Sequence, residues 1–297
     1  MSDPTQALRD HQPSHDFLIC IDSDGCAFDT MELKHKECFI PNIIKFWGLQ
    51  PVSKFARDAA EFVNLYSQWR GINRFPALPL TFDLLSDWDK VQARKAAIPP
   101  IPNLRRWLET ESKLGNPALQ AYCDAHPDEE DMQCALAWSK AVNATVADVV
   151  GDGLPPFPYV RECLDKSSKA ADMMVCSQTP TAALTQEWSE QGIADYVFAI
   201  AGQELGKKGE HIQFASEGRY QPDRILMIGD APGDRKAAEQ NGALFFPINP
   251  GEEDVSWKRL FEEGLDRFFN GTYRGAYQEA LIADFERFLP DTPPWKR

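Results

Sequence analysis

Phe17-Leu-Ile-Cys-Ile-Asp22-Ser-Asp24-Gly25-Cys26 joins an apolar run to a pair of carboxylates near the start of this 297-residue chain. The run lacks polar alternation, which predicts a short strand buried on both faces of a parallel sheet. Asp22 and Asp24, two positions apart, leave the strand end in the same direction, and Gly25 allows a sharp turn behind them. Like charges this close are costly unless a cation lies between them or one carboxylate keeps a proton. The stretch therefore predicts a strand whose carboxyl end carries a charged site.

Later apolar runs of the same kind alternate with helical patterns. They lie at residues 173–176, 196–200, 225–228 and 243–246. Strand and helix in repeated alternation are typical of an α/β fold with a doubly wound parallel sheet. We therefore predict a Rossmann-like core.

The segment 31–150 contains no such run. It has helical periodicity and holds five of the eight tryptophans, so it has the aromatic side chains for an apolar core of its own. We expect a large all-helical domain at 31–150, inserted after the first strand of an α/β core made of residues 1–30 and 151–297.

A second acidic cluster follows another apolar run, in Gly229-Asp230-Ala-Pro-Gly-Asp234. Loops at the carboxyl ends of parallel strands converge on the ligand crevice, so Asp22, Asp24, Asp230 and Asp234 are expected to meet there. Oxygen ligands without a nearby His or Cys cluster suit Mg²⁺ better than zinc. The sequence therefore predicts a Mg²⁺ site at this edge of the sheet.

Two other strand ends add groups that suit an anion. Ser177 offers a hydroxyl and backbone N–H groups at the start of a helix, which is a natural seat for phosphate oxygens. Lys208 stands just before another helix, where its charge could offset the carboxylates; the adjacent Lys207 is the alternative.

In this order, the segments resemble the four motifs of the haloacid dehalogenase-like hydrolase superfamily, and the helical insertion resembles its C1-type cap. The matching residues are Asp22, Asp24, Gly25 and Asp29 for the first motif, Ser177 for the second, Lys208 (or Lys207) for the third, and Gly229, Asp230 and Asp234 for the fourth. One departure is Cys26, where members typically carry Thr. A thiol is a weaker donor, and no His partner is apparent that would make Cys26 a nucleophile.

The resemblance implies a Mg²⁺-dependent phosphatase of small phosphomonoester metabolites that works through an aspartyl-phosphate intermediate. Asp22 would be the nucleophile, and Asp24 would act first as the acid and then as the base. Ser177 and Lys208 would bind the equatorial phosphoryl oxygens. Mg²⁺ would be held by Asp22, the Asp24 backbone carbonyl and Asp230, with Asp234 orienting the metal or the lysine.

Two other functions stay open at this stage. Residues 29–32 resemble the start of the β-phosphoglucomutase cap, which would make the protein a phosphomutase. The second alternative is a non-catalytic protein that binds phosphorylated metabolites on the same scaffold. A dinucleotide-binding enzyme is not favoured, because no GxGxxG follows the first strand.

Charge and composition exclude several classes of partner. The chain has 31 basic and 45 acidic residues, a formal net charge of -14, which repels nucleic acids and anionic membranes. No apolar run approaches the roughly 18 residues that span a bilayer. Seven cysteines without a CxxC pair are typical of a protein in a reducing compartment. The polar N-terminus has no apolar signal region. We expect a cytoplasmic protein that binds a small phosphorylated metabolite.

Arg70 and Arg74 are candidates for substrate recognition in the insertion. They concentrate two guanidinium groups in an otherwise acidic protein, and the planar fork of Arg suits oxyanions. The alternative is that both lie on a solvated outer face.

Overall fold

Two compact units form the protein, which we describe from a computed structural model. The described residues are 3–151 and 153–296; residues 1, 2, 152 and 297, which the sequence assigned to the α/β core, lie outside them. The first unit contains the described residues up to Met31 and those from Gly153 to Leu289. The second contains Glu32–Gly151 and Pro290–Lys296.

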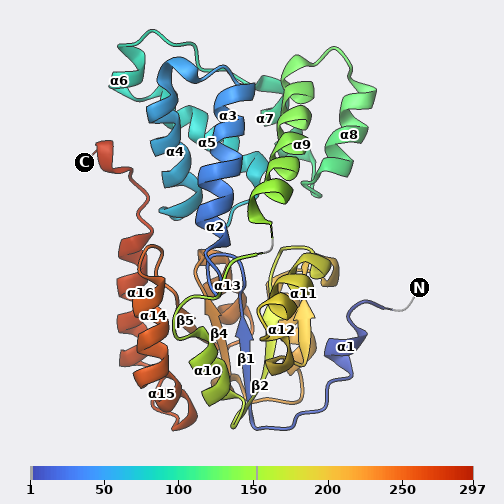
Figure 1. Ribbon diagram of the computed structural model, residues 1–297, viewed down its shortest axis with the longest axis vertical. Helices are drawn as coiled ribbons and strands as arrows, with labels where there is room; N and C mark the ends of the chain where they lie inside the picture. The colour runs from blue at the N-terminus through green and yellow to red at the C-terminus, as the bar shows by residue number, and fades with distance from the viewer. Residues whose placement is uncertain (1–2, 152, 297) are drawn as a thin grey trace. The chain divides into compact units, whose positions relative to one another are not determined.

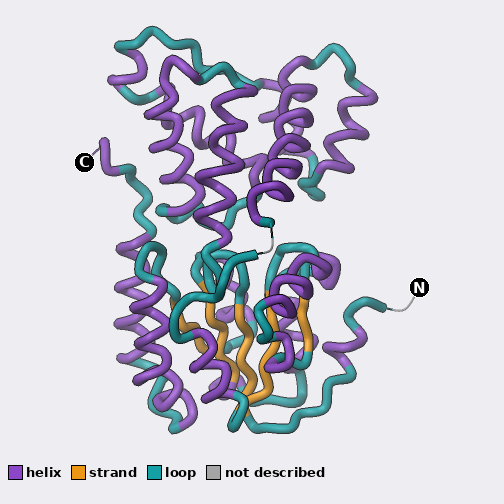
Figure 2. The backbone as a smooth tube through the Cα atoms, in the orientation of Figure 1, coloured by secondary structure: helices purple, strands orange, loops and turns teal. Residues whose placement is uncertain are grey.

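A five-stranded parallel sheet lies at the centre of the first unit (Figures 1 and 2). Its strand order is β3-β2-β1-β4-β5, so the two earliest strands lie beside each other in the interior. The strands are β1 (Phe17–Ile21), β2 (Ala171–Cys176), β3 (Ala199–Ala201), β4 (Ile225–Gly229) and β5 (Leu244–Pro247). The third strand begins later than the apolar run at 196–200, because Ala194–Tyr196 closes a 3-10 turn first.

Both faces of the sheet are buried, as the uninterrupted apolar runs predict. Along β1, Ile19 and Ile21 pack into one apolar cluster, whereas Leu18 and Cys20 pack into another. The two clusters lie on opposite faces of the sheet, because successive side chains of a strand point to alternate faces. Each cluster also contains helix residues, so helices cover both sides. The predicted doubly wound α/β core is confirmed.

The helices of the first unit connect and cover these strands. They are α1 (Gln6–Arg9), α10 (Val160–Ser167), α11 (Thr181–Glu190), α12 (Lys208–Ser216), α13 (Pro232–Gln240), α14 (Glu253–Arg259), α15 (Leu265–Phe269) and α16 (Ala276–Phe288), with a π-helical turn at Leu260–Gly264.

The second unit contains helices joined by loops, and its described residues include no strand (Figure 2). Its apolar core includes Trp47, Trp88, Trp107 and Trp138, so four of the tryptophans in the insertion are core residues. Its helices are α3 (Ile40–Phe46), α4 (Ser53–Leu65), α5 (Arg74–Ser86), α6 (Asp89–Gln92), α7 (Pro102–Thr110), α8 (Asn116–Ala125) and α9 (Glu130–Val150), preceded by α2 (Thr30–Leu33) and a π-helical stretch, η1 (Lys34–Phe39).

The C-terminal tail belongs to the second unit, not to the α/β core as the sequence analysis expected. Trp295 stacks on Trp88 with ring centroids 4.0 Å apart, and its edge meets Phe62 at 5.7 Å. The backbone N–H of Gln68 also donates to the carbonyl of Pro290. The tail therefore completes the apolar core of the helical insertion.

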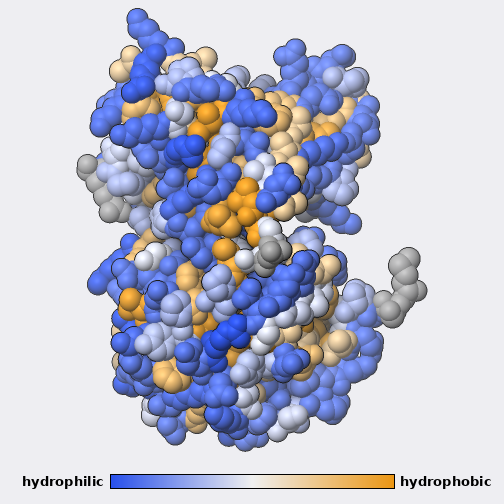
Figure 3. Space-filling model, viewed as in Figure 1, coloured by the Kyte–Doolittle hydropathy of each residue, from blue (hydrophilic) through white to orange (hydrophobic). Residues whose placement is uncertain are grey.

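Large apolar side chains are mostly inside. Among the described residues, only Val149 and Val255 are exposed large hydrophobics, and hydrophilic residues dominate the viewed surface (Figure 3). All seven thiols are free, and six are buried. None of the described helices is both long and apolar enough to cross a membrane.

Candidate active site

Asp22 stands where β1 ends and faces a positive charge. Its backbone N–H donates to the Ile228 carbonyl on β4, which keeps the residue in line with the sheet. Its Oδ1 accepts from the Ser23 N–H at 2.8 Å, and its Oδ2 lies 2.7 Å from Nζ of Lys208. Gly25 follows with φ +78°, a conformation that glycine adopts at little cost. The sharp turn predicted behind the two carboxylates is therefore present.

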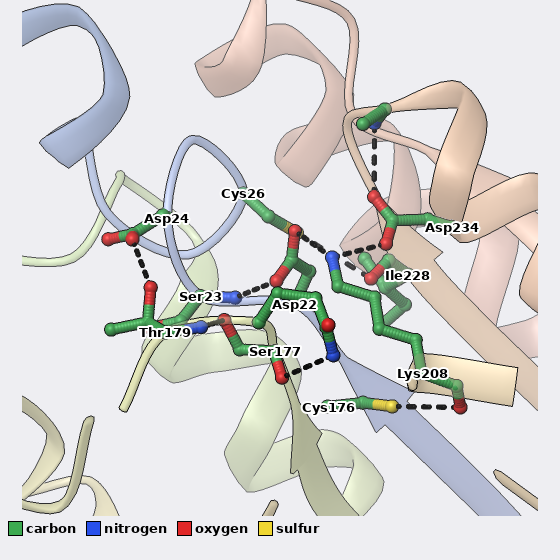
Figure 4. Close-up of polar contacts among 12 residues, drawn as sticks. Asp22, Ser23, Asp24, Cys26, Cys176, Ser177, Thr179, Lys208, Ile228 and Asp234 are labelled. Carbon is green, nitrogen blue, oxygen red and sulfur yellow. Dashed lines mark hydrogen bonds and ion pairs between the residues drawn. The ribbon is translucent and has the colours of Figure 1, made fainter. Parts of the chain in front are cut away.

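Lys208, the first residue of α12, reaches two carboxylates at once. Its Nζ lies 2.7 Å from Asp22 and 2.5 Å from Oδ1 of Asp234 (Figure 4). The neighbouring Lys207 is exposed, and its backbone N–H donates to Glu210 in the cap of the same helix. Of the two lysines in the third motif, it is Lys208 whose ammonium enters the site.

Asp230 and Asp234 follow β4, and both side chains are fully buried. Asp234 Oδ2 accepts from the Ala231 N–H at 3.0 Å and so caps the start of α13, while Oδ1 is left to Lys208. Gly229 makes this approach possible, because a Cβ there would lie 2.4 Å from Cβ and Cγ of Asp234. Glycine is therefore required in the fourth motif by space.

The electrostatics of these groups are set by burial and by their shared ammonium. Burial raises the pKa of Asp22 well above its ordinary value; Lys208 opposes the rise, and the carboxylates of Asp234 and Asp230 add to it. Burial likewise raises the pKa of Asp234 against the pull of Lys208. Burial alone would lower the pKa of Lys208, but the two carboxylates that it contacts raise it well above its ordinary value. Lys208 therefore remains an ammonium at neutral pH.

The acidic cluster fits a hard divalent cation. Oxygen atoms of Asp22, Asp230 and Asp234 lie within 4.8 Å of one another, and all three residues are buried. When ionised, three carboxylates beside one ammonium leave a net charge of -2, which a single divalent ion balances. Carboxylate oxygens without His or Cys are the donors that Mg²⁺ prefers. Asp24 is not part of this cluster of side chains.

Ser177 lies directly after β2, as predicted, and is buried. Its N–H donates to the Ala201 carbonyl at 2.9 Å, and its Oγ accepts from the Thr179 N–H at 3.3 Å (Figure 4). The residue is thus placed by β3 on one side and by its own loop on the other.

The Asp24 carboxylate is held by two threonine hydroxyl groups. Thr179 Oγ1 donates to Oδ2 at 2.6 Å, and Thr30 Oγ1 donates to Oδ1. In Figure 4, Ser23 lies between this carboxylate and the group formed by Asp22 and Lys208. These two hydroxyl groups come from outside the acidic cluster.

Cys26 is buried directly behind the turn. Its Sγ lies 3.7 Å from the Ile228 carbonyl, so the thiol contacts the neighbouring strand β4. Burial raises the pKa of Cys26 well above its ordinary value, and the surrounding carboxylates raise it further. A thiol that stays protonated is a poor nucleophile, which agrees with the sequence argument.

The guanidinium groups of Arg70, which is buried, and Arg74, which is half-buried, both bind oxygen atoms of the helical unit. Arg70 is buried, and its guanidinium donates to the Leu65 carbonyl at 2.8 Å. Arg74 donates to Asn143 Oδ1 at 2.7 Å and to Oγ of Ser139 at 3.1 Å, inside the helical unit. These contacts favour a structural role for both arginines, so we do not propose them further as substrate-binding residues.

Two contributors to the site were missed from the sequence. Thr30 and Thr179 bind Asp24. Thr179 lies two residues after Ser177, and this pair of hydroxyl residues was the available signal. Nothing local pairs Thr179 with a residue 155 positions earlier in the chain.

Comparisons with known proteins match this chain to solved structures only. No protein-family model and no curated protein sequence matches the chain. Among solved structures, it is similar to a haloacid dehalogenase-like hydrolase from Streptococcus pneumoniae, with 13% identity over 82% of this chain and 90% of that one and a TM-score of 0.46.

Two further structures match over most of their length. One is a β-phosphoglucomutase from Clostridium difficile, with 15% identity over 86% of this chain and 97% of that one and a TM-score of 0.48. The other is a predicted phosphoglycolate phosphatase from Haemophilus somnus, with 13% identity over 80% of this chain and 87% of that one and a TM-score of 0.46.

Proposed function

We propose that this chain is a Mg²⁺-dependent phosphatase of the haloacid dehalogenase-like superfamily, which hydrolyses small phosphomonoesters through an aspartyl-phosphate. One observation carries the proposal: at the start of α12, Lys208 contacts both Asp22 and Asp234, which follow β1 and β4. Asp230 lies within 4.8 Å of both carboxylates. A buried cluster of carboxylates is costly to fold, so its presence indicates that binding or catalysis requires it.

In the first step, a carboxylate oxygen of Asp22 attacks phosphorus and the bond from phosphorus to the ester oxygen breaks. The leaving oxygen takes a proton from the Asp24 carboxyl group. Lys208 and Ser177 would bind the equatorial oxygens, whose charge must be stabilised during the transfer.

In the second step, water attacks phosphorus of the aspartyl-phosphate. Asp24, now a carboxylate, takes the proton of the water, and Asp22 leaves as a free carboxylate together with inorganic phosphate. One carboxyl group thus serves as acid and then as base, and the enzyme returns to its starting protonation state.

Asp22 and Asp230 would hold Mg²⁺, with the backbone carbonyl of Asp24. Bound there, the ion lowers the repulsion between an anionic nucleophile and an anionic phosphate ester. Asp234, already bonded to Lys208 and to the Ala231 N–H, would keep both the lysine and the metal site in place.

A panel of phosphomonoesters tests this proposal, with Mg²⁺-dependent release of inorganic phosphate as the readout. We expect release with at least one ester and loss of release in EDTA. Conversion of a sugar phosphate into its isomer in the presence of a bisphosphate, without net phosphate release, would instead favour the phosphomutase. Saturable binding without turnover would favour the non-catalytic alternative.

A further inference from the structure

We infer that Thr179 is a positioning residue for Asp24, an inference that rests on the proposed function. Its hydroxyl donates to Oδ2 of Asp24 at 2.6 Å, a short bond of the kind that hydroxyl groups make to carboxylates. Thr179 is placed to act through Asp24, not on the phosphorus centre.

A side chain of Asp rotates freely unless something holds it. The two threonine hydroxyls approach Asp24 from separate parts of the chain, one on each carboxylate oxygen. Thr30 comes from the start of α2, and Thr179 from the loop between β2 and α11. Two contacts on different oxygens fix the rotation of the carboxyl group, which one contact would not.

The loop that carries Thr179 is itself held firmly. The Thr179 carbonyl accepts from the Gln203 N–H at 3.1 Å, and both the N–H and the hydroxyl of Thr181 donate to Glu204. Gly202 packs so tightly here that a Cβ would lie 2.6 Å from the Thr179 carbonyl oxygen. The hydroxyl is therefore presented from a rigid support.

Thr179 also connects two residues of the proposed mechanism. Its N–H donates to Oγ of Ser177, and its hydroxyl donates to Asp24 (Figure 4). One residue thus fixes the position of Asp24, the proposed acid, relative to the Ser177 hydroxyl, which would bind the phosphoryl group. Proton transfer depends strongly on such placement, because a small displacement of the acid reduces its contribution.

Thr179→Val tests this role, since valine keeps the shape and removes the hydroxyl. The substrates are phenyl phosphate and p-nitrophenyl phosphate, which match in size but differ in how much the leaving oxygen needs a proton. We expect kcat/KM to fall at least about tenfold for phenyl phosphate and much less for p-nitrophenyl phosphate. Thr179→Ser, which restores the hydroxyl, should recover most of the loss.

Thr185→Val is the matched control, because it removes a hydroxyl from α11 that donates only to the Thr181 carbonyl among the bonds described. It should leave both esters unaffected. Equal losses on both esters with Thr179→Val, no loss, or a gain would overturn the inference, as would failure of Thr179→Ser to recover activity.

A crystal structure of Thr179→Val separates this inference from the proposed function. The inference requires the Asp24 carboxylate to change orientation or to become disordered in the variant. An unchanged Asp24 would overturn it. If the wild-type protein hydrolyses neither ester, the proposed phosphatase function fails on that result, and the orientation of Asp24 still decides whether Thr179 positions it.

Discussion

Lys208 Nζ lies 2.7 Å from Oδ2 of Asp22, so a buried ammonium contacts the carboxylate that we propose as the nucleophile. The same ammonium contacts Asp234, which in turn caps α13. The lysine thus ties the first and fourth motifs together. In the proposed reaction, its charge would shift from holding two carboxylates to binding the phosphoryl oxygens.

Asp22→Asn should abolish turnover while the protein stays folded, because an amide cannot accept the phosphoryl group. We expect a loss of at least about 10³-fold in kcat. Phosphate release and the circular dichroism spectrum would be measured together. Asp29→Asn, at an exposed position in the same loop, is the control. Residual activity within about tenfold of wild type, a difference of only ~1.4 kcal/mol in the barrier, contradicts the covalent mechanism.

EDTA should remove activity, and Mg²⁺ should restore it where Ca²⁺ does not. Calcium accepts more ligands at longer distances and would misplace the nucleophile. Asp230→Asn should raise the Mg²⁺ concentration for half-maximal activity at least about tenfold, whereas Asp29→Ala should not. Mg²⁺ should also raise the Tm of the wild type but not that of Asp230→Asn. Equal effects of the two substitutions would show that the fourth motif is assigned wrongly.

His211 should make the protein less stable in mild acid. Burial lowers the pKa of His211 from 6.5 to about 4 in the folded chain. Between these two values the unfolded chain binds more protons than the folded one, so the free energy of unfolding falls as pH drops through this window. The stability that the neutral His211 side chain contributes is fully present above pH 6.5. Below about pH 4, the free energy of unfolding is lower by about 3 kcal/mol.

Urea unfolding at pH 4, 5, 6 and 7.5 measures this loss, on the order of 1 kcal/mol per pH unit. His211→Asn should flatten the decline relative to wild type, while the exposed His126→Asn should not. Parallel curves for wild type and His211→Asn would contradict the assignment.

Trp295→Ala should destabilise the helical unit. The indole stacks on Trp88 at an interplanar angle of 6° and meets Phe62 edge-on. Losing a partly buried indole with two ring contacts should reduce the free energy of unfolding by about 2 kcal/mol. Chemical denaturation followed by tryptophan fluorescence and circular dichroism checks this value. Lys296→Ala, which removes an exposed ion pair with Asp87, should change it by less than about 1 kcal/mol. Equal effects of the two substitutions would mean that the tail is not part of the core.

Sequence alone determined the parallel sheet and the identity of the charged strand ends. Apolar runs of four or five residues that alternate with helical patterns favour strands buried on both faces, and the carboxyl ends of parallel strands share an edge. For that reason four aspartates, Asp22, Asp24, Asp230 and Asp234, could be grouped from the sequence. The Asp24 side chain nevertheless lies outside the cluster that the other three form. The separation of a helical insertion from the α/β core followed in the same way, because its apolar residues repeat at helical spacing and not at strand spacing.

Only the tertiary structure decided which partners these residues have. Lys207 is the extended N-cap residue and Lys208 the first residue of α12, so the choice of Lys208 over Lys207 depends on how α12 packs. The Thr179 bond to Asp24 joins residues 155 positions apart. Trp295 of the tail stacks on Trp88, which is also far from it in the sequence. The sequence does not distinguish Arg70 and Arg74 from arginines on a solvated surface. In the structure, carbonyl and side-chain oxygens of the helical unit bind them. Local patterns specify what a residue can bond to, whereas long-range packing selects the partner.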